Sequence, residues 1–126
     1  MPTAAGAFNL LVMLVLGHFV ADFGLQGDRM ATEKCPGSQG VMSWQWWLVA
    51  HGAIHGFMVA LITGQPWLGL VEWVVHMAID RGKCNRAYGM GGDQALHLSC
   101  KLLWTLVVWA GASPAPWWMG QAPSLG

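Results

Sequence analysis

Hydrophobic positions along the chain gather into four long runs, which are separated by short segments containing Gly, Pro and charged residues. Each run is long enough for several helical turns, and the separators carry turn-forming residues. The sequence therefore predicts an all-α bundle of four membrane helices, over residues 4–26, 43–63, 67–80 and 93–111. The third helix is short for a membrane span, which takes about 20 residues. We expect residues 1–111 to form one domain, and the Pro- and Trp-containing residues 112–126 to form an irregular tail at a membrane surface.

Polar residues enter the last two hydrophobic runs at a spacing of four. The third run carries Glu72, His76 and Asp80, and the fourth carries Asp93, His97 and Lys101. Positions i, i+4 and i+8 share one face of a helix, so each run should bear a polar stripe. An antiparallel pairing of these helices about residues 81–92 predicts three facing pairs: Asp80 with Asp93, His76 with His97, and Glu72 with Lys101.

The first two runs each add another pair of ionisable side chains. His18 and Asp22 lie four residues apart near the end of the first run, and His51 and His55 lie four apart in the second. Beside the second pair is Gly52-x3-Gly56, a small-residue spacing that lets membrane helices approach closely. All five histidines of the chain thus fall into i, i+4 pairs with another His or with Asp, which indicates one shared site.

Composition places these helices in a lipid environment. The chain is 55% hydrophobic and only 10% charged, whereas soluble domains carry charge at about a quarter of their positions. The net charge is zero and there is no basic run, which argues against nucleic acid as a partner and favours the lipid bilayer.

Basic residues predict the orientation. Arg29 and Lys34 lie in the first loop and three more in residues 81–86, whereas residues 1–6, 64–66 and 112–126 contain none. By the positive-inside rule, we expect both basic loops in the cytoplasm and both termini outside it, in a multi-pass protein of the bacterial inner membrane. The first run lacks the basic start of a signal peptide, so we expect it to be retained as a membrane helix.

The three cysteines, Cys35, Cys84 and Cys100, form no C-x-x-C pair and are odd in number. This pattern is typical of neither a zinc knuckle nor a disulfide framework. Since Cys35 and Cys84 lie in the two loops assigned to the cytoplasm, we expect all three thiols to be free and reduced.

The ionisable side chains favour a metal site. Each such group at membrane depth costs about 2.5–3.5 kcal/mol, so a cluster of them needs a reason. Imidazole and carboxylate together suit Zn, Mn or Fe, and His/Asp pairs one turn apart are how helical bundles hold metals. The four carboxylates of the cluster carry a charge of −4, and Lys101 contributes +1. The remaining charge of −3 would be largely neutralised by a dication. The four are Asp22, Glu72, Asp80 and Asp93. The expected ligands of one or two divalent ions are His18, His51, His55, His76, Asp80 and His97.

Two other interpretations fit the same residues. The first is a hydrogen-bonded polar seam that fixes helix packing, with the aspartates near enough to the loops to be solvated. The second is a path for protons or ions, because buried carboxylates and histidines also serve as relays.

Several motifs resemble a known family. They are His18-Phe-Val-Ala-Asp22-Phe-Gly-Leu-Gln26, the His51/His55 pair, His76-Met-Ala-Ile-Asp80-Arg and Asp93-Gln94-x2-His97. Over residues 10–106 the chain resembles the small bacterial and phage membrane proteins called domain of unknown function 3307, a family that implies no established activity. It is more remotely similar to bacterial membrane-bound metal-dependent hydrolases, which also carry His and Asp on short membrane helices.

The function expected from these features is a membrane-embedded, metal-dependent hydrolase whose site opens towards the cytoplasmic leaflet. A water activated by the ion would attack an ester or phosphoester of a lipid or lipid-linked substrate. Asp22 or Asp93 would act as the general base. No Ser-His-Asp or Cys-His arrangement is recognisable. The alternative is a non-enzymatic phage or bacterial membrane protein, such as a lysis or host-interaction factor, in which the polar residues are structural.

Overall fold

The computed structural model describes residues 3–112 and 116–119. Over these residues the protein is all-α, with five α-helices and no strand, which confirms the all-α part of the predicted fold. The helices are α1 (Ala4–Phe19), α2 (Asp28–Glu33), α3 (Trp44–Thr63), α4 (Pro66–Cys84) and α5 (Met90–Val107). Short π-helical turns continue α1 as η1 (Val20–Gly24) and α5 as η2 (Val108–Ala112), and η3 (Trp117–Met119) is a 3-10 turn.

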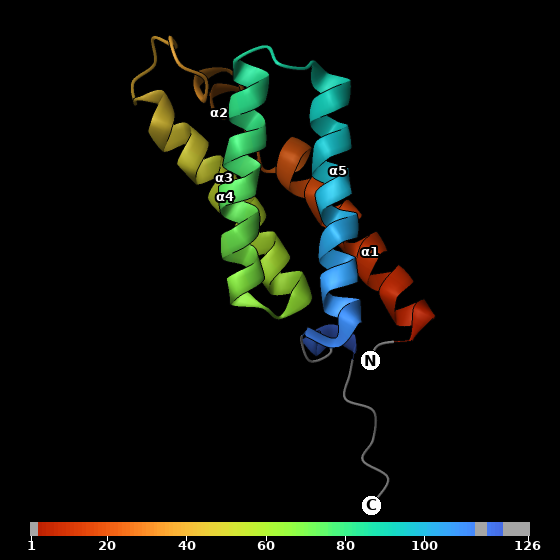
Figure 1. Ribbon diagram of the computed structural model, residues 1–126. Helices are drawn as coiled ribbons and strands as arrows, with labels where there is room; N and C mark the ends of the chain where they lie inside the picture. Colours follow the sequence, from red (N-terminus) through yellow and green to blue (C-terminus); the bar gives the residue numbers. More distant parts are fainter. Residues whose placement is uncertain (1–2, 113–115, 120–126) are drawn as a thin grey trace, which may run out of the picture.

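The four long helices pack as a bundle. Helices α4 and α5 run antiparallel, side by side, and are joined by a short loop at one end of the molecule (Figure 1). Helix α3 packs most extensively on α4, and α1 contacts both α3 and α5. Helix α1 begins and α5 ends at the opposite end of the molecule from the α4–α5 loop (Figure 1).

The prediction of a short third helix over residues 67–80 is wrong. Helix α4 continues to Cys84, because the basic Arg81 and Lys83 of its last turn interact favourably with the helix C-terminus. Helix α5 begins at Met90, so Asp93 lies inside its first turn, with its N–H bonded to the Gly89 carbonyl at 3.0 Å. The expected loop of residues 81–92 therefore shrinks to residues 85–89.

A close glycine contact joins α3 to α4. A Cβ added to Gly56 would lie 2.6 Å from the Gly69 carbonyl oxygen, and one added to Gly69 would lie 2.5 Å from that of Gly56. A Cβ on Gly52 would lie 2.7 Å from Cγ of Met77. The close approach predicted at Gly52-x3-Gly56 is confirmed.

An apolar core fills the half of the bundle nearer the chain termini. Its buried members come from all four long helices and from η2: Leu10, Leu14, Val59, Ile62, Leu68, Trp104 and Val108. The buried histidines and aspartates lie nearer the α4–α5 loop, and the Glu72–Lys101 pair lies at the boundary, where Glu72 contacts both Trp104 of this core and His76. The fold thus divides into an apolar half and a polar half.

The prediction of three free thiols is wrong for two of them. Cys35 and Cys84 form a disulfide, with Cα atoms 5.4 Å apart, and Cys100 is free. The paired cysteines are 49 residues apart. The bond joins the segment after α2 to the end of α4, so the pairing depends on tertiary structure that cysteine spacing does not reveal.

Two helices are long and apolar enough to cross a membrane, Ala4–Gly24 and Trp44–Thr63. Buried core helices and signal sequences share this length and apolar composition. In the first helix, however, only 28% of the most apolar window is buried. Phe8, Leu16 and Phe23 are all more than half exposed on its surface. The structure is therefore compatible with a membrane protein, and the four-span bundle stays a prediction.

The expected tail falls largely on residues 113–115 and 120–126, which lie outside the described residues. The described part, η3, packs on the end of α3. The indole N–H of Trp117 donates to the Leu61 carbonyl at 2.7 Å, and that of Trp118 donates to the Ile62 carbonyl.

Candidate metal centre

The polar stripes of α4 and α5 meet with the predicted pairing at the level furthest from the α4–α5 loop. Glu72 and Lys101 form an ion pair, and each is only 1% exposed. The indole N–H of Trp104 donates to the other carboxylate oxygen of Glu72. One turn along, the rings of His76 and His97 stack with their centroids 4.1 Å apart, which confirms the second predicted pair.

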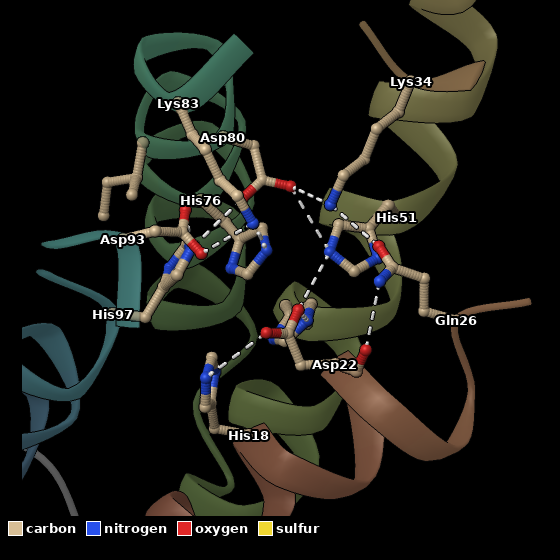
Figure 2. A network of polar contacts seen from close by, with 12 residues as sticks. His18, Asp22, Gln26, Lys34, His51, His76, Asp80, Lys83, Asp93 and His97 are labelled. Atoms are coloured by element: carbon tan, nitrogen blue, oxygen red, sulfur yellow. Dashed lines mark hydrogen bonds and ion pairs between the residues drawn. The ribbon is translucent and has the colours of Figure 1, made fainter. Parts of the chain in front are cut away.

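At the third level, Asp80 and Asp93 share a partner. Nε2 of His97 lies 3.0 Å from Oδ1 of Asp80 and 3.4 Å from Oδ1 of Asp93. Nε2 of His76 is 3.7 Å from the same Asp80 oxygen. The two aspartates thus lie on either side of His97 (Figure 2).

The first two hydrophobic runs complete the cluster. Asp22 lies in the π-helical turn η1, a distortion that often marks functional sites in helices. Its Oδ1 is 3.2 Å from Nε2 of His51 and 3.4 Å from Nε2 of His55. His51 Nε2 also lies 3.4 Å from Oδ2 of Asp80. His51 therefore connects the carboxylate of η1 to the carboxylate of α4 (Figure 2).

These side chains form two groups with the spacing of metal ligands. One comprises Asp22, His51, His55 and His76, and the other comprises His76, Asp80 and His97; within each, the ligand atoms lie within 4.8 Å of one another. Oxygen and nitrogen ligands lie about 2.0–2.2 Å from Zn²⁺, so two neighbouring ligands of one ion are about 3.0–3.6 Å apart. The distances from Asp22 to His51 and His55 fall in this range.

Three of the imidazole nitrogens that face the carboxylates lack hydrogen bonds, whereas Nε2 of His97 bonds to Asp80. Nε2 of His51, His55 and His76 is buried and has no hydrogen-bond partner among the residues described. Nδ1 of His76 lies 3.4 Å from Oε1 of Glu72, to which it can donate. That contact would leave the lone pair of His76 Nε2 directed into the cluster, as in carboxylate–histidine–metal arrangements. Buried polar atoms are rarely left unpaired, so these nitrogens fit a bound cation.

The charge of the cluster differs from the value counted from the sequence. Lys34 Nζ lies 2.6 Å from Asp80 Oδ2, and Lys83 Nζ lies 3.4 Å from Asp93 Oδ2. With Lys101 on Glu72, four carboxylates (−4) and three lysines (+3) leave −1 instead of −3. The carboxylate without a lysine in these ion pairs is Asp22. The uncompensated negative charge therefore lies in the first ligand group.

Two expected site residues have other positions. His18 lies outside both ligand groups: its Nε2–H donates to Oε1 of Gln94 at 2.9 Å, and the Gln94 amide donates to Asp22 Oδ2 at 2.7 Å. Asp22, expected as a general base, lies inside the first ligand group. Asp93, the other expected base, has a buried Oδ1 with no hydrogen-bond partner among the described residues.

Sequence reasoning missed Lys34 and the bridging role of Gln94. Gln94 follows Asp93 directly, so its position in that motif could have drawn attention to it. Lys34 follows the short helix α2 and carries no periodic signal, although it is only 7% exposed. Its ammonium contacts Asp80 and also Oε1 of Gln26, at 2.8 Å (Figure 2).

Comparison with known proteins identifies the family but not the activity. No curated protein and no solved structure matches the chain, so the remote similarity to membrane-bound hydrolases is not shown. A family model described as "Protein of unknown function (DUF3307)" matches residues 10–119, which include every side chain of the two ligand groups. The chain therefore belongs to the DUF3307 family of proteins of unknown function.

Proposed function

We propose that the protein is a membrane-embedded, metal-dependent hydrolase with four membrane-spanning helices. The observation that carries the proposal is the convergence of the unpaired Nε2 atoms of His51, His55 and His76 on Asp22 and Asp80. A polar seam that served packing alone should satisfy its buried nitrogens, since each unpaired group costs about 1–3 kcal/mol.

The two ligand groups would hold one ion each, with His76 at their junction. Asp22, His51 and His55 would bind the first ion, and Asp80 and His97 the second. Mixed nitrogen and oxygen ligands suit Zn, Mn or Fe. Such an ion would supply Lewis-acid activation of water and of the scissile ester or phosphoester.

In this proposal Asp93 acts as the general base. Its Oδ1 is buried, has no hydrogen bond to the described residues, and lies 3.4 Å from Nε2 of His97. Its other oxygen lies 3.4 Å from Lys83, which holds the carboxylate in place. Asp93 can therefore accept a proton beside the second ligand group without itself being needed as a ligand.

The membrane setting supports a lipid or lipid-linked substrate. Helix α1 exposes large apolar side chains along its length. Five of the six Lys and Arg residues lie in the segments around α2 and the α4–α5 loop, and the sixth is Lys101. In our proposal this end faces the cytoplasm of a bacterial cell, both termini lie outside the cytoplasm, and the site opens near the cytoplasmic leaflet.

A conduction path is less consistent with the packing. Counted from the α4–α5 loop, the polar cluster ends at the Glu72–Lys101 pair. The apolar core beyond this pair includes Leu10, Leu14 and Leu68, each at most 1% exposed. The buried Thr63 and Thr105 hydroxyls bond to carbonyls of their own helices. Protons or ions crossing the bundle would meet this apolar layer without polar groups to carry them.

A hydrolysis assay tests the proposal. The metal-loaded protein in mixed micelles should release phosphate or fatty acid from a panel of lipid-linked phosphoesters and lipid esters, and a chelator should stop the release reversibly. Asp93→Asn should lower kcat by about 10²–10⁴, the usual contribution of a general base, with metal content unchanged. Asp28→Asn, which alters an exposed carboxylate of α2, is the matched control and should leave kcat unchanged. Full kcat in Asp93→Asn would refute the assigned role, and no turnover on the panel would count against the hydrolase.

A further inference from the structure

The segment around α2 covers the candidate metal centre and is lightly held. Helix α2 itself has no buried residue. Apart from backbone hydrogen bonds within turns, three successive residues make the side-chain contacts that hold the segment. Glu33 accepts from the Trp47 indole at 2.9 Å, Lys34 binds Asp80, and Cys35 is bonded to Cys84.

Lys34 occupies Oδ2 of Asp80, one of the two oxygens of a proposed ligand, whereas His76 and His97 contact Oδ1. Its Nζ lies 2.6 Å from Oδ2 of Asp80, and that same oxygen is 3.4 Å from Nε2 of His51. A charge-assisted hydrogen bond of this length is strong. A dication that used Asp80 Oδ2 would therefore have to displace the ammonium of Lys34 (Figure 2).

The disulfide fixes this ammonium in place. Asp80 and Cys84 are four residues apart on α4 and so lie on one helix face. Lys34 and Cys35 are adjacent in the chain: Lys34 contacts Asp80, and Cys35 is bonded to Cys84. As long as the disulfide is intact, the Lys34 side chain has little freedom to leave Asp80.

We propose that the Cys35–Cys84 disulfide is a redox latch that holds Lys34 on Oδ2 of Asp80 and so weakens the binding of a divalent cation at this carboxylate. A dithiol reductant opens it: one thiolate attacks a cysteine sulfur, the S–S bond breaks, and the second thiol of the reductant resolves the mixed disulfide. The products are two cysteine thiols and the oxidised, disulfide form of the reductant. Released from Cys84, the segment carrying Lys34 withdraws and exposes Asp80 to the ion.

The predicted orientation points to a reversible bond. This inference rests on the proposed function and topology, in which the basic segments near α2 and the end of α4 face the cytoplasm. Disulfides in that compartment are usually transient and redox-sensing. A latch beside a metal ligand has this character, whereas a purely structural bond would have no reason to position a cation on the site.

Two measurements on the whole protein in mild detergent test the latch. Mn²⁺ binding is followed by the electron paramagnetic resonance signal of the free ion, with and without a phosphine reductant, which does not compete for the metal as a dithiol would. Reactivity of the Lys34 amine towards an acylating reagent is followed by mass spectrometry in the same two states.

Reduction should tighten the binding of the second Mn²⁺ ion, at the group that contains Asp80, at least about tenfold, because Asp80 no longer has to give up a charge-assisted hydrogen bond. It should also expose the Lys34 amine to acylation. Lys34→Met should bind Mn²⁺ tightly in both states, and the double variant Cys35→Ser/Cys84→Ser should match the reduced protein without reductant. Arg29→Met removes an exposed cation from α2, the helix that precedes Lys34; its side chain is 63% exposed. This variant should keep the redox dependence of the parent protein.

The outcomes separate the latch from the metal site. An equal number of bound Mn²⁺ ions with equal affinities in the oxidised and reduced parent protein would overturn the latch and leave the proposed metal site standing, and so would equal acylation of Lys34 in both states. Absence of Mn²⁺ binding in every form, including Lys34→Met and the double cysteine variant, would overturn the proposed metal site and the latch's role with it.

Discussion

The buried ion pair between Glu72 and Lys101 predicts a strong coupling in a double-mutant cycle. Both side chains are 1% exposed, so neither charge reaches water when its partner is removed. Lys101→Met leaves the Glu72 carboxylate with the Trp104 indole and a 3.4 Å contact to His76. Breaking a buried pair in this way typically costs about 3–5 kcal/mol in free energy of unfolding. Glu72→Gln should cost a similar amount, because it leaves the ammonium of Lys101 unpaired.

The double variant Glu72→Gln/Lys101→Met should recover most of this loss. No charge is then buried, and the amide oxygen that replaces the carboxylate still accepts from Trp104. Replacing both partners of a buried pair is often close to neutral, so the coupling energy should be at least about 3 kcal/mol. Equilibrium unfolding by sodium dodecyl sulfate in mild detergent, followed by circular dichroism, measures each corner of the cycle. Single-variant costs that add up to the double-variant cost within about 0.5 kcal/mol would refute the reasoning.

Two further predictions concern packing and topology. Gly69→Ala should destabilise the protein by about 1–3 kcal/mol in the same unfolding assay, because its Cβ would lie 2.5 Å from the Gly56 carbonyl oxygen. The control is Gly89→Ala, where a Cβ meets nothing within 4 Å. Equal stabilities of the two variants would contradict the close packing. Reporter fusions after Gly126 and within residues 37–40 should give opposite signals, exported for the first and cytoplasmic for the second. Equal signals would contradict the proposed orientation.

The sequence predicted the parts of the site that obey helical periodicity. Glu72 and His76 were assigned their partners Lys101 and His97 because residues four apart share a helix face, and antiparallel helices bring such faces together. Helix ends were less predictable. Arg81 and Lys83 indicated a loop by their charge, although basic residues also stabilise the last turn of a helix.

The covering segment could not be predicted from the sequence. Lys34 and Cys35 reach the site only through the path of the chain after α2, and no periodic pattern describes that path. The Cys35–Cys84 bond and the Lys34–Asp80 contact are both tertiary, across 49 and 46 residues respectively. Without Lys34 and Lys83, the charge of the cluster was also counted as too negative.

Metal content tests the central claim most directly. Protein purified in mild detergent without a His-tag or chelator, after growth with ample metal, should retain about one or two Zn, Mn or Fe ions per chain by elemental analysis. His76→Ala should lose most of this metal, because its Nε2 lies at the junction of both ligand groups. The double variant Glu72→Gln/Lys101→Met should keep the metal, since neither residue belongs to a ligand group. Well-folded, metal-free wild-type protein would contradict the account and leave the histidines and aspartates as a structural seam.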